Sequence, residues 1–293
     1  MCRYFSGVVN SEGKVFTLSD CSQGDPMSHE TIISTFGLKD EKLKNRDIVR
    51  FEITPKDDTV LAKCKRSELN HDLFSFRWDE EKTLPKWLED NPAEIIAKCW
   101  LAAEESWKQH LLLDGETLEK LEQNQFIHLM GTNTTIQQMR DNSVVHIMGD
   151  NSIVHRMVDS SVVQEMRANS VVHSMRDNSV VHRMRDNSVV HYIEDSSVVH
   201  IMGDNSIVYH MWNSSVVRHM GNSSVVQEMR DNSVVQTMRA NSVVQTMRDN
   251  SVVHRMGDNS VVHLLNDLTV ARKNGTVFVA KNQKITQQSK VKT

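Results

Sequence analysis

Aspartate, serine and histidine recur together along the chain, for example at Asp141, Ser143 and His146. These residue types build catalytic triads, in which the nucleophile is hydrogen-bonded to a base. The same trio recurs many times, however, and a glutamine replaces the histidine elsewhere, at Gln164, Gln227, Gln236 and Gln245. A catalytic site is a single place, so the repetition favours a structural role. We expect a protein that is not an enzyme.

Metal binding is a second chemistry to consider. Four histidines recur at a constant interval or a multiple of it, at His128, His146, His182 and His200. Stacked imidazoles can hold a metal ion, but an outward polar row accounts for the same spacing. Elsewhere His29 precedes Glu30 and His71 precedes Asp72, and such single pairs are more typical of surface residues than of acid–base catalysis. We expect no metal site and no cofactor.

A column of arginines could bind phosphates of a nucleic acid. These residues are Arg140, Arg176, Arg230 and Arg248. An aspartate follows each of them and offsets much of the positive charge. Nucleic acid is therefore the weaker alternative to a protein partner.

The residues above belong to a nine-residue repeat, beginning MRDNSVVHI, that runs from Met139 to Leu264 as fourteen units without an insertion or deletion. Repetition at a fixed period is typical of a solenoid, in which each unit stacks on its neighbours. Nine residues make 2.5 turns of an α-helix, which would give no constant buried face. The Val-Val pair favours a strand and Asp-Asn-Ser favours a turn.

The unit also predicts which side chains face the core. Numbered from its Met, the register continues upstream from Leu121, which makes sixteen units, and position seven is apolar in all of them. We expect Ser143 and Val145, at positions five and seven, to point inward, and Val144 and His146 to point outward. An inward Met at position one needs a bend or bulge near position nine. The opposite parity, with positions six and one inside, stays open.

Exceptions to the repeat give the number of units in a coil. Position two is glycine at residues 131, 149, 203, 221 and 257, and position three is alanine at 168 and 240. All of these spacings are multiples of 18. Two units therefore make one coil, and the expected fold is mainly β, a two-sided parallel β-solenoid of eight coils, about 38 Å long at about 4.8 Å per coil.

Three segments are expected. Residues 1–111 form a small α+β domain with a hairpin over 3–18, a helix over 29–36, strands over 47–54 and 73–78, and a helix from 93 to about 112 that covers the first coil. Residues 112–273 form the solenoid. Residues 274–293 form a C-terminal cap and basic tail, with a hairpin at Asn274-Gly275 and disorder over 283–293.

Charge and cysteine content give little further direction. The formal net charge is -4, and residues 265–293 hold six basic residues and one acidic residue. All four cysteines precede the repeats, at Cys2, Cys21, Cys64 and Cys99. No CxxC spacing, signal peptide or long apolar run is present, so we expect a reduced, cytoplasmic protein without a membrane segment.

Departures from the repeat mark a candidate partner-binding patch, because a residue that the fold does not need is available to a partner. They fall in four consecutive units, at Tyr192, Glu194, Tyr209, His210, Trp212, Arg218 and His219. Tyr192 and His210 are two repeat units apart in the chain, and so are Glu194 and Trp212, so each pair is expected to stack. Exposed Trp, Tyr and Arg are typical of interface hot spots.

The solenoid segment resembles known repeat families. Its nonapeptide period resembles the calcium-binding RTX β-roll, although Met-Arg-Asp-Asn-Ser stands in place of the GGxGxD motif, so calcium is not implied. The Ser143-Val144-Val145 arrangement is similar to pentapeptide-repeat solenoids, some of which mimic DNA. The tandem units also resemble repeat proteins encoded by phages and mobile elements.

These observations together predict a non-enzymatic β-solenoid scaffold that binds another macromolecule through its flat faces. A protein partner is expected, and self-association as a homodimer is left open. The alternative is a phage or mobile-element inhibitor that occupies the surface of a host defence or nucleic-acid enzyme.

Overall fold

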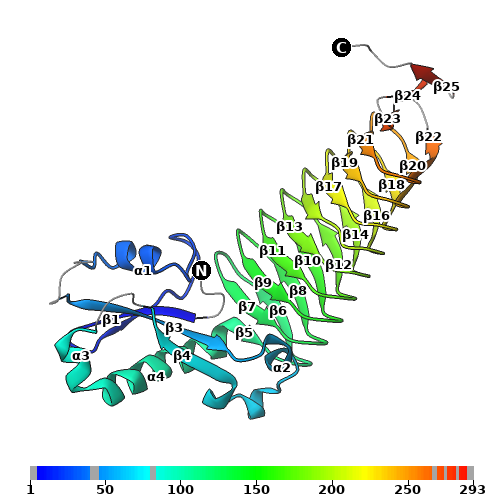
Figure 1. The fold of residues 1–293 in the computed structure, drawn as a ribbon. Coiled ribbons are helices and arrows are strands. Elements are labelled where there is room, and N and C mark those ends of the chain that lie inside the picture. The colour runs from blue at the N-terminus through cyan, green and yellow to red at the C-terminus, as the bar shows by residue number, and fades with distance from the viewer. Residues whose placement is uncertain are drawn as a thin grey trace.

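The computed structural model describes residues 5–39, 46–79, 84–265, 269–273, 276–281 and 284–288. Within them the chain forms a small N-terminal domain and a long stack of strands that extends away from it (Figure 1). The stack is a parallel β-solenoid, so the predicted fold class is confirmed.

The N-terminal domain contains a four-stranded antiparallel sheet with the order β2-β1-β3-β4. Its strands are β1 (Phe5–Asn10), β2 (Val15–Phe16), β3 (Ile48–Pro55) and β4 (Phe74–Trp78). Its α-helices are α1 (His29–Thr35), α2 (Asp58–Ala62), α3 (Lys86–Asp90) and α4 (Pro92–His110), with 3-10 turns at Arg66–Glu68 and His71–Leu73. Local signals explain the predicted elements: Ser28 caps α1 and Pro92 occupies the first turn of α4.

Two sheets form the walls of the solenoid, and we name them by their size among the described residues. The nine-stranded sheet comprises β6 (Thr117–Leu121), β8 (Thr135–Met139), β10 (Ile153–Met157), β12 (Val171–Met175), β14 (Val189–Ile193), β16 (Ile207–Met211), β18 (Val225–Met229), β20 (Val243–Met247) and β22 (Val261–Leu265). The twelve-stranded sheet comprises β5 (Leu111–Leu112), β7 (Phe126–Met130), β9 (Val144–Met148), β11 (Val162–Met166), β13 (Val180–Met184), β15 (Val198–Ile201), β17 (Val216–Met220), β19 (Val234–Met238), β21 (Val252–Met256), β23 (Thr269–Lys273), β24 (Thr276–Lys281) and β25 (Lys284–Gln288).

Every repeat stacks on the second repeat before it and the second repeat after it. Val162 pairs with Val144 and Met166 with Met148, and the same offset holds from coil to coil in both sheets. Two units per coil are therefore confirmed. The stacked register begins before Leu121, because Leu118 pairs with Ile136, so the described residues form nine coils where eight were expected.

The inward positions are the predicted ones. Ser143, Val145 and Met148, at positions five, seven and one, have no exposed surface, whereas Val144 is half-buried. The alternative parity is wrong. Paired residues occupy positions six, seven, nine and one, and the ladder passes over position eight. This irregularity next to position nine lets the Met side chain return to the core.

Two kinds of turn alternate around each coil. From Asp141 onward, turns leading to the twelve-stranded sheet have positive φ at positions three and four, as at Asp141 (42°) and Asn142 (61°), and we call them double-αL turns. Turns leading back have positive φ only at position four, as at Asn151, and we call them single-αL turns. Aspartate and asparagine tolerate this conformation better than other non-glycine residues. Ala168 and Ala240 at position three both fall in single-αL turns, where the alanine has no positive φ.

The N-terminal domain packs on the start of the solenoid. Helix α4 contacts β5 and β7, and its Trp107 shares a buried cluster with Leu129 and Ile147, which face outward from the twelve-stranded sheet. The His110 ring stacks on Phe126 with 3.9 Å between ring centroids. The domain therefore buries the outer face of this sheet over the first coils, where later coils present polar side chains.

The C-terminal strands add to one sheet only. Strand β24 pairs with β23 and with β25, antiparallel in both cases. The predicted hairpin residues Asn274 and Gly275 lie outside the described residues. The prediction of disorder over 283–293 is wrong for part of that range, because Lys284–Gln288 form β25. Backbone pairing with β24 explains this order in a polar segment.

Three cysteines are described, and each is a free thiol: Cys21, Cys64 and Cys99. Burial raises the pKa of the Cys99 thiol to about 12, so it stays protonated. None of the helices in the described part of the chain is long and apolar enough to span a bilayer.

Adjacent valines of β14 test the inward and outward positions. Val190 is fully buried and Val189 is half-buried on the outer face. Val190→Asp should lower the free energy of unfolding by about 3 kcal/mol or more, because it buries an unpaired carboxylate. Val189→Asp should cost about 1 kcal/mol or less. Thermal melts followed by circular dichroism measure both, and a larger loss for Val189→Asp would contradict the assignment.

Candidate binding faces of the solenoid

The structure does not assemble the triad-like residues of the repeat. Ser143 lies inside the core with no exposed surface, whereas His146 lies on the outer face of the twelve-stranded sheet. In some other units the serine hydroxyl donates to a turn carbonyl, as from Ser170 to the oxygen of Arg167 at 2.6 Å, whereas the hydroxyl of Ser143 has no hydrogen-bond partner among the described residues. In both units the backbone N–H of the serine donates to the position-two carbonyl, from Ser143 to Arg140 and from Ser170 to Arg167, and the small side chain fits inside the core.

The seven residues of the predicted patch divide between the two sheets. Tyr192 lies on β14, Tyr209 and His210 lie on β16, and Glu194 and Trp212 lie in the turns that follow these strands. These five residues lie on adjacent coils of the nine-stranded sheet. Arg218 and His219 lie on β17 of the twelve-stranded sheet, on the other side of the core. The structure therefore brings five of the seven together.

Three of these side chains form one ring cluster. The rings of Tyr192 and His210 stack with 5.0 Å between centroids and 14° between planes. Trp212 contacts both, at 5.6 Å from Tyr192 and 5.3 Å from His210. The guanidinium of Arg230 lies 6.0 Å from the Trp212 ring, within range of a cation–π interaction. Tyr192 is 38% exposed, so the cluster reaches solvent.

A second row of rings lies on the same sheet, one position earlier in the repeat. It contains His155, His173, His191 and Tyr209, with neighbouring ring centroids 4.6, 4.8 and 5.0 Å apart. The histidines of this row have the same coil-length spacing as the predicted histidine row, so the sequence spacing alone could have predicted this second row. We call the two rows with Trp212 the ring face: His155, His173, His191, Tyr192, Tyr209, His210 and Trp212.

Ion pairs border the ring face. Glu194 is buried and pairs with Arg176 at 2.9 Å. Glu228 pairs with Arg230 at 2.6 Å, with Arg248 at 3.6 Å and with His210 at 3.3 Å. Three of the four arginines proposed to bind phosphates therefore already have a carboxylate partner, which would compete with a nucleic acid.

The twelve-stranded sheet carries a shallow groove of about 510 Å³. Its lining side chains come from positions eight and nine of four coils: His146, Ile147, Gln164, Glu165, His182, Arg183, His200 and Ile201. Three of the four histidines in the predicted row lie here. The fourth, His128, is fully buried beneath the N-terminal domain, and neither of its ring nitrogens has a hydrogen-bond partner among the described residues.

Burial lowers the pKa of several of these imidazoles. The pKa of His128 lies well below its usual value, first because burial penalises the charged form and then because His146 and His110 are close. Burial also lowers the pKa of His110. It lowers the pKa values of three less buried rings in the two rows as well, those of His173, His191 and His200. Burial therefore favours the neutral form of these five rings.

The two histidines singled out in the N-terminal domain have other partners than their chain neighbours. His71 pairs with Glu104 at 2.6 Å and is partly exposed. His29, expected at the surface, is instead buried, and its Nδ1 lies 3.3 Å from Asp79 Oδ2. No local sequence signal marks this contact, because the fold brings together residues that are distant in the chain.

Comparisons of the chain with known protein families, with curated proteins and with solved structures find no match. No residue role is therefore transferred from another protein, and the resemblances in repeat period show no family.

The low pKa values predict how stability depends on pH. An unfolded histidine titrates near 6.5, and these folded rings titrate lower, so below about pH 6.5 the unfolded state binds more protons than the folded state. The free energy of unfolding should be constant above about pH 7.5 and fall as the pH drops from 7 to 5, with the buried His128 contributing most. Urea titrations at several pH values measure this slope.

Other coils have glutamine at the repeat position of His128, so a histidine-to-glutamine substitution introduces a residue that this position already accepts. His128→Gln should flatten the decline between pH 7 and 5, whatever its effect on stability at pH 8. His254→Gln, at the same repeat position but with an exposed ring, is the control and should leave the slope as it is in the wild type. An unchanged slope in His128→Gln would refute the assigned cause.

Proposed function

We propose that the protein is a non-enzymatic binding scaffold whose ring face contacts a protein partner. The observation that carries this proposal is the grouping of seven rings over β10, β12, β14 and β16, on the outer face of one sheet. Val and Met columns build the core, so the fold does not require tyrosine or tryptophan at these outer positions. Their concentration in consecutive coils supports a role in recognition.

The composition of the ring face favours a protein over a nucleic acid. Tyrosine, tryptophan and arginine are the residues most enriched at protein hot spots. The neighbouring arginines are neutralised by Glu194 and Glu228, and the chain as a whole has a net charge of -4. A polyanion therefore meets no strong positive field here.

Stacking in register also favours binding without a large entropic cost. Each ring lies against the ring one coil away, at 4.6 to 5.6 Å between centroids, and the strands beneath are paired on both sides. Side chains that are already ordered lose little freedom when a partner docks. The face is thus suited to a flat partner surface or to an extended segment along the stack.

The alternative hypothesis, an inhibitor that occupies the surface of a host enzyme, stays a prediction and would use the same face. Self-association is the case in which the partner is a second copy of this chain.

Two double variants on opposite sheets test the proposal. Tyr192→Ser with Trp212→Ser removes two rings from the ring face, and Arg218→Ser with His219→Ser changes the predicted residues on the other sheet. The wild type should capture a partner from a nuclease-treated bacterial lysate, and surface plasmon resonance with the purified partner should show about 100-fold weaker binding for the ring-face variant. The opposite-sheet variant should bind as the wild type does.

Light scattering of the wild type and the two variants tests self-association. If the wild type and the opposite-sheet variant are dimers and the ring-face variant is a monomer, the partner is a second copy of this chain. The proposal fails if the ring-face variant keeps wild-type affinity, or if only the opposite-sheet variant loses binding. Circular dichroism confirms that both variants are folded.

A further inference from the structure

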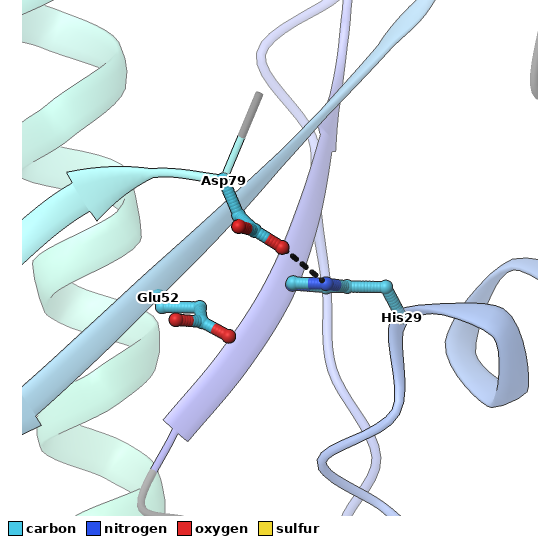
Figure 2. Close-up of side chains that lie close together, drawn as sticks. All are labelled: His29, Glu52 and Asp79. Atoms are coloured by element: carbon cyan, nitrogen blue, oxygen red, sulfur yellow. Dashed lines mark ion pairs between the residues drawn. The ribbon is translucent and has the colours of Figure 1, made fainter. Parts of the chain in front are cut away.

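A histidine and two carboxylates converge in the N-terminal domain, away from the ring face. His29 is the first residue of α1, Glu52 lies in β3 and Asp79 follows β4 (Figure 2). Each offers one ligand atom, and these atoms lie within 4.8 Å of one another. His29 and Glu52 are buried, with side chains 8% and 5% exposed, and Asp79 lies at the surface. Three separate elements thus direct their polar atoms to one point.

The hydrogen bond on the far side of the imidazole fixes its tautomer. His29 Nε2 lies 3.1 Å from the carbonyl oxygen of Phe51, which can only accept, so Nε2 carries the hydrogen. In the neutral ring, Nδ1 then presents a lone pair to Asp79 Oδ2 at 3.3 Å. Two acceptors face each other at this distance, and the arrangement is stable only with a cation between them, either a proton or a metal ion.

The same arrangement is the usual environment of a metal-binding histidine. Such a histidine donates its other ring N–H to a carbonyl or carboxylate, which orients the ring and leaves the second nitrogen for the metal. In a tetrahedral zinc site with ligands at about 2.0–2.1 Å, neighbouring ligand atoms are about 3.3 Å apart. Nδ1 and Oδ2 already have this separation, and a Glu52 carboxylate oxygen within 4.8 Å of them has to move closer to complete the set.

Arg77 is the group that competes for Glu52. Its Nε and Nη2 both donate to the same carboxylate oxygen, Oε2. The Arg77 side chain is 64% exposed and Glu52 is nearly buried, so the arginine has room to move away and release the carboxylate. Its charge offsets one of the two carboxylates and leaves the other negative charge for a divalent cation.

We propose that His29 Nδ1, the Asp79 carboxylate and the Glu52 carboxylate form a binding site for a first-row divalent metal ion, of which Zn²⁺ is the representative. One imidazole with two carboxylates suits such an ion, whereas Ca²⁺ and Mg²⁺ prefer oxygen ligands throughout. Three protein ligands leave a coordination position for water or for a substrate atom, and it opens at the surface through Asp79. This site is independent of the proposed binding scaffold.

Isothermal titration of the chelator-treated full-length protein with Zn²⁺ tests the proposal. The comparison is between variants, so any Zn²⁺ bound elsewhere on the chain cancels. Asp79→Asn removes an exposed ligand and leaves the buried residues in place. Asp72→Asn, an exposed aspartate next to His71, is the matched control. The wild type and the control should bind one more Zn²⁺ per chain than Asp79→Asn, or bind it at least tenfold more tightly.

Co²⁺ gives a second readout that does not depend on stoichiometry, since a four-coordinate site gives visible absorption bands. The wild type and Asp72→Asn should show these bands, and Asp79→Asn and His29→Gln should lose them, with circular dichroism confirming that each variant is folded. Equal Zn²⁺ binding and equal Co²⁺ spectra in wild type and Asp79→Asn would overturn the proposal, and the cation between His29 and Asp79 would then be a proton.

Discussion

The hydrogen-bond ladder between equivalent residues of successive coils is the constraint on which the rest of the solenoid depends. Each strand is paired with its equivalents in the preceding and following coils, so identical repeat positions lie one above the other. Like residues therefore form columns: Val, Met and Ser inside, and imidazole or amide side chains outside. A substitution at an outer position changes a column without disturbing the core, which is how rings gather on one face.

The backbone geometry of the turns restricts the sequence more than the strands do. A double-αL turn needs two consecutive residues with positive φ, and only Asp, Asn and Ser occupy these positions in the described coils. Glycine at position two marks the single-αL turns, where a Cβ on Gly149 would lie 2.5 Å from the carbonyl oxygen of Gly131. The two turn types make the sides of the coil distinguishable and fix which sheet each unit joins.

The sequence predicts most of the solenoid because its period is exact and its physics is local. Period, coil size and inward positions all follow from repeated letters, and the ring stacking follows from the spacing of two units. The same spacing separates the two faces: Arg218 and His219 lie one repeat unit after Tyr209 and His210, which places them on the opposite sheet. The repeat letters do not extend the register before Leu121 because Glu116 replaces serine, although Gly115 supplies the positive φ of position four.

The N-terminal domain is less predictable for a physical reason. Its strands and helices follow from local signals, but the sheet order and the packing against β7 depend on contacts between distant residues. His29, Glu52 and Asp79 are far apart in the chain, and no repeat relates them. The sequence around Glu52 indicates only a strand, and the sequence around His29 indicates only the start of a helix. Their convergence is a result of tertiary structure alone.

The most direct test of the two-unit register is a pair of deletions that remove one coil or half of one. Removing residues 229–246 should keep every downstream residue on its own sheet, and the melting temperature should fall only slightly, because stability is nearly a sum over repeats. Removing residues 229–237 moves the downstream units to the opposite sheet and places Ala240 at a positive φ, which costs about 1–2 kcal/mol, or about 2–8 °C in melting temperature. Equal melting temperatures for the two deletions would contradict the two-sided coil.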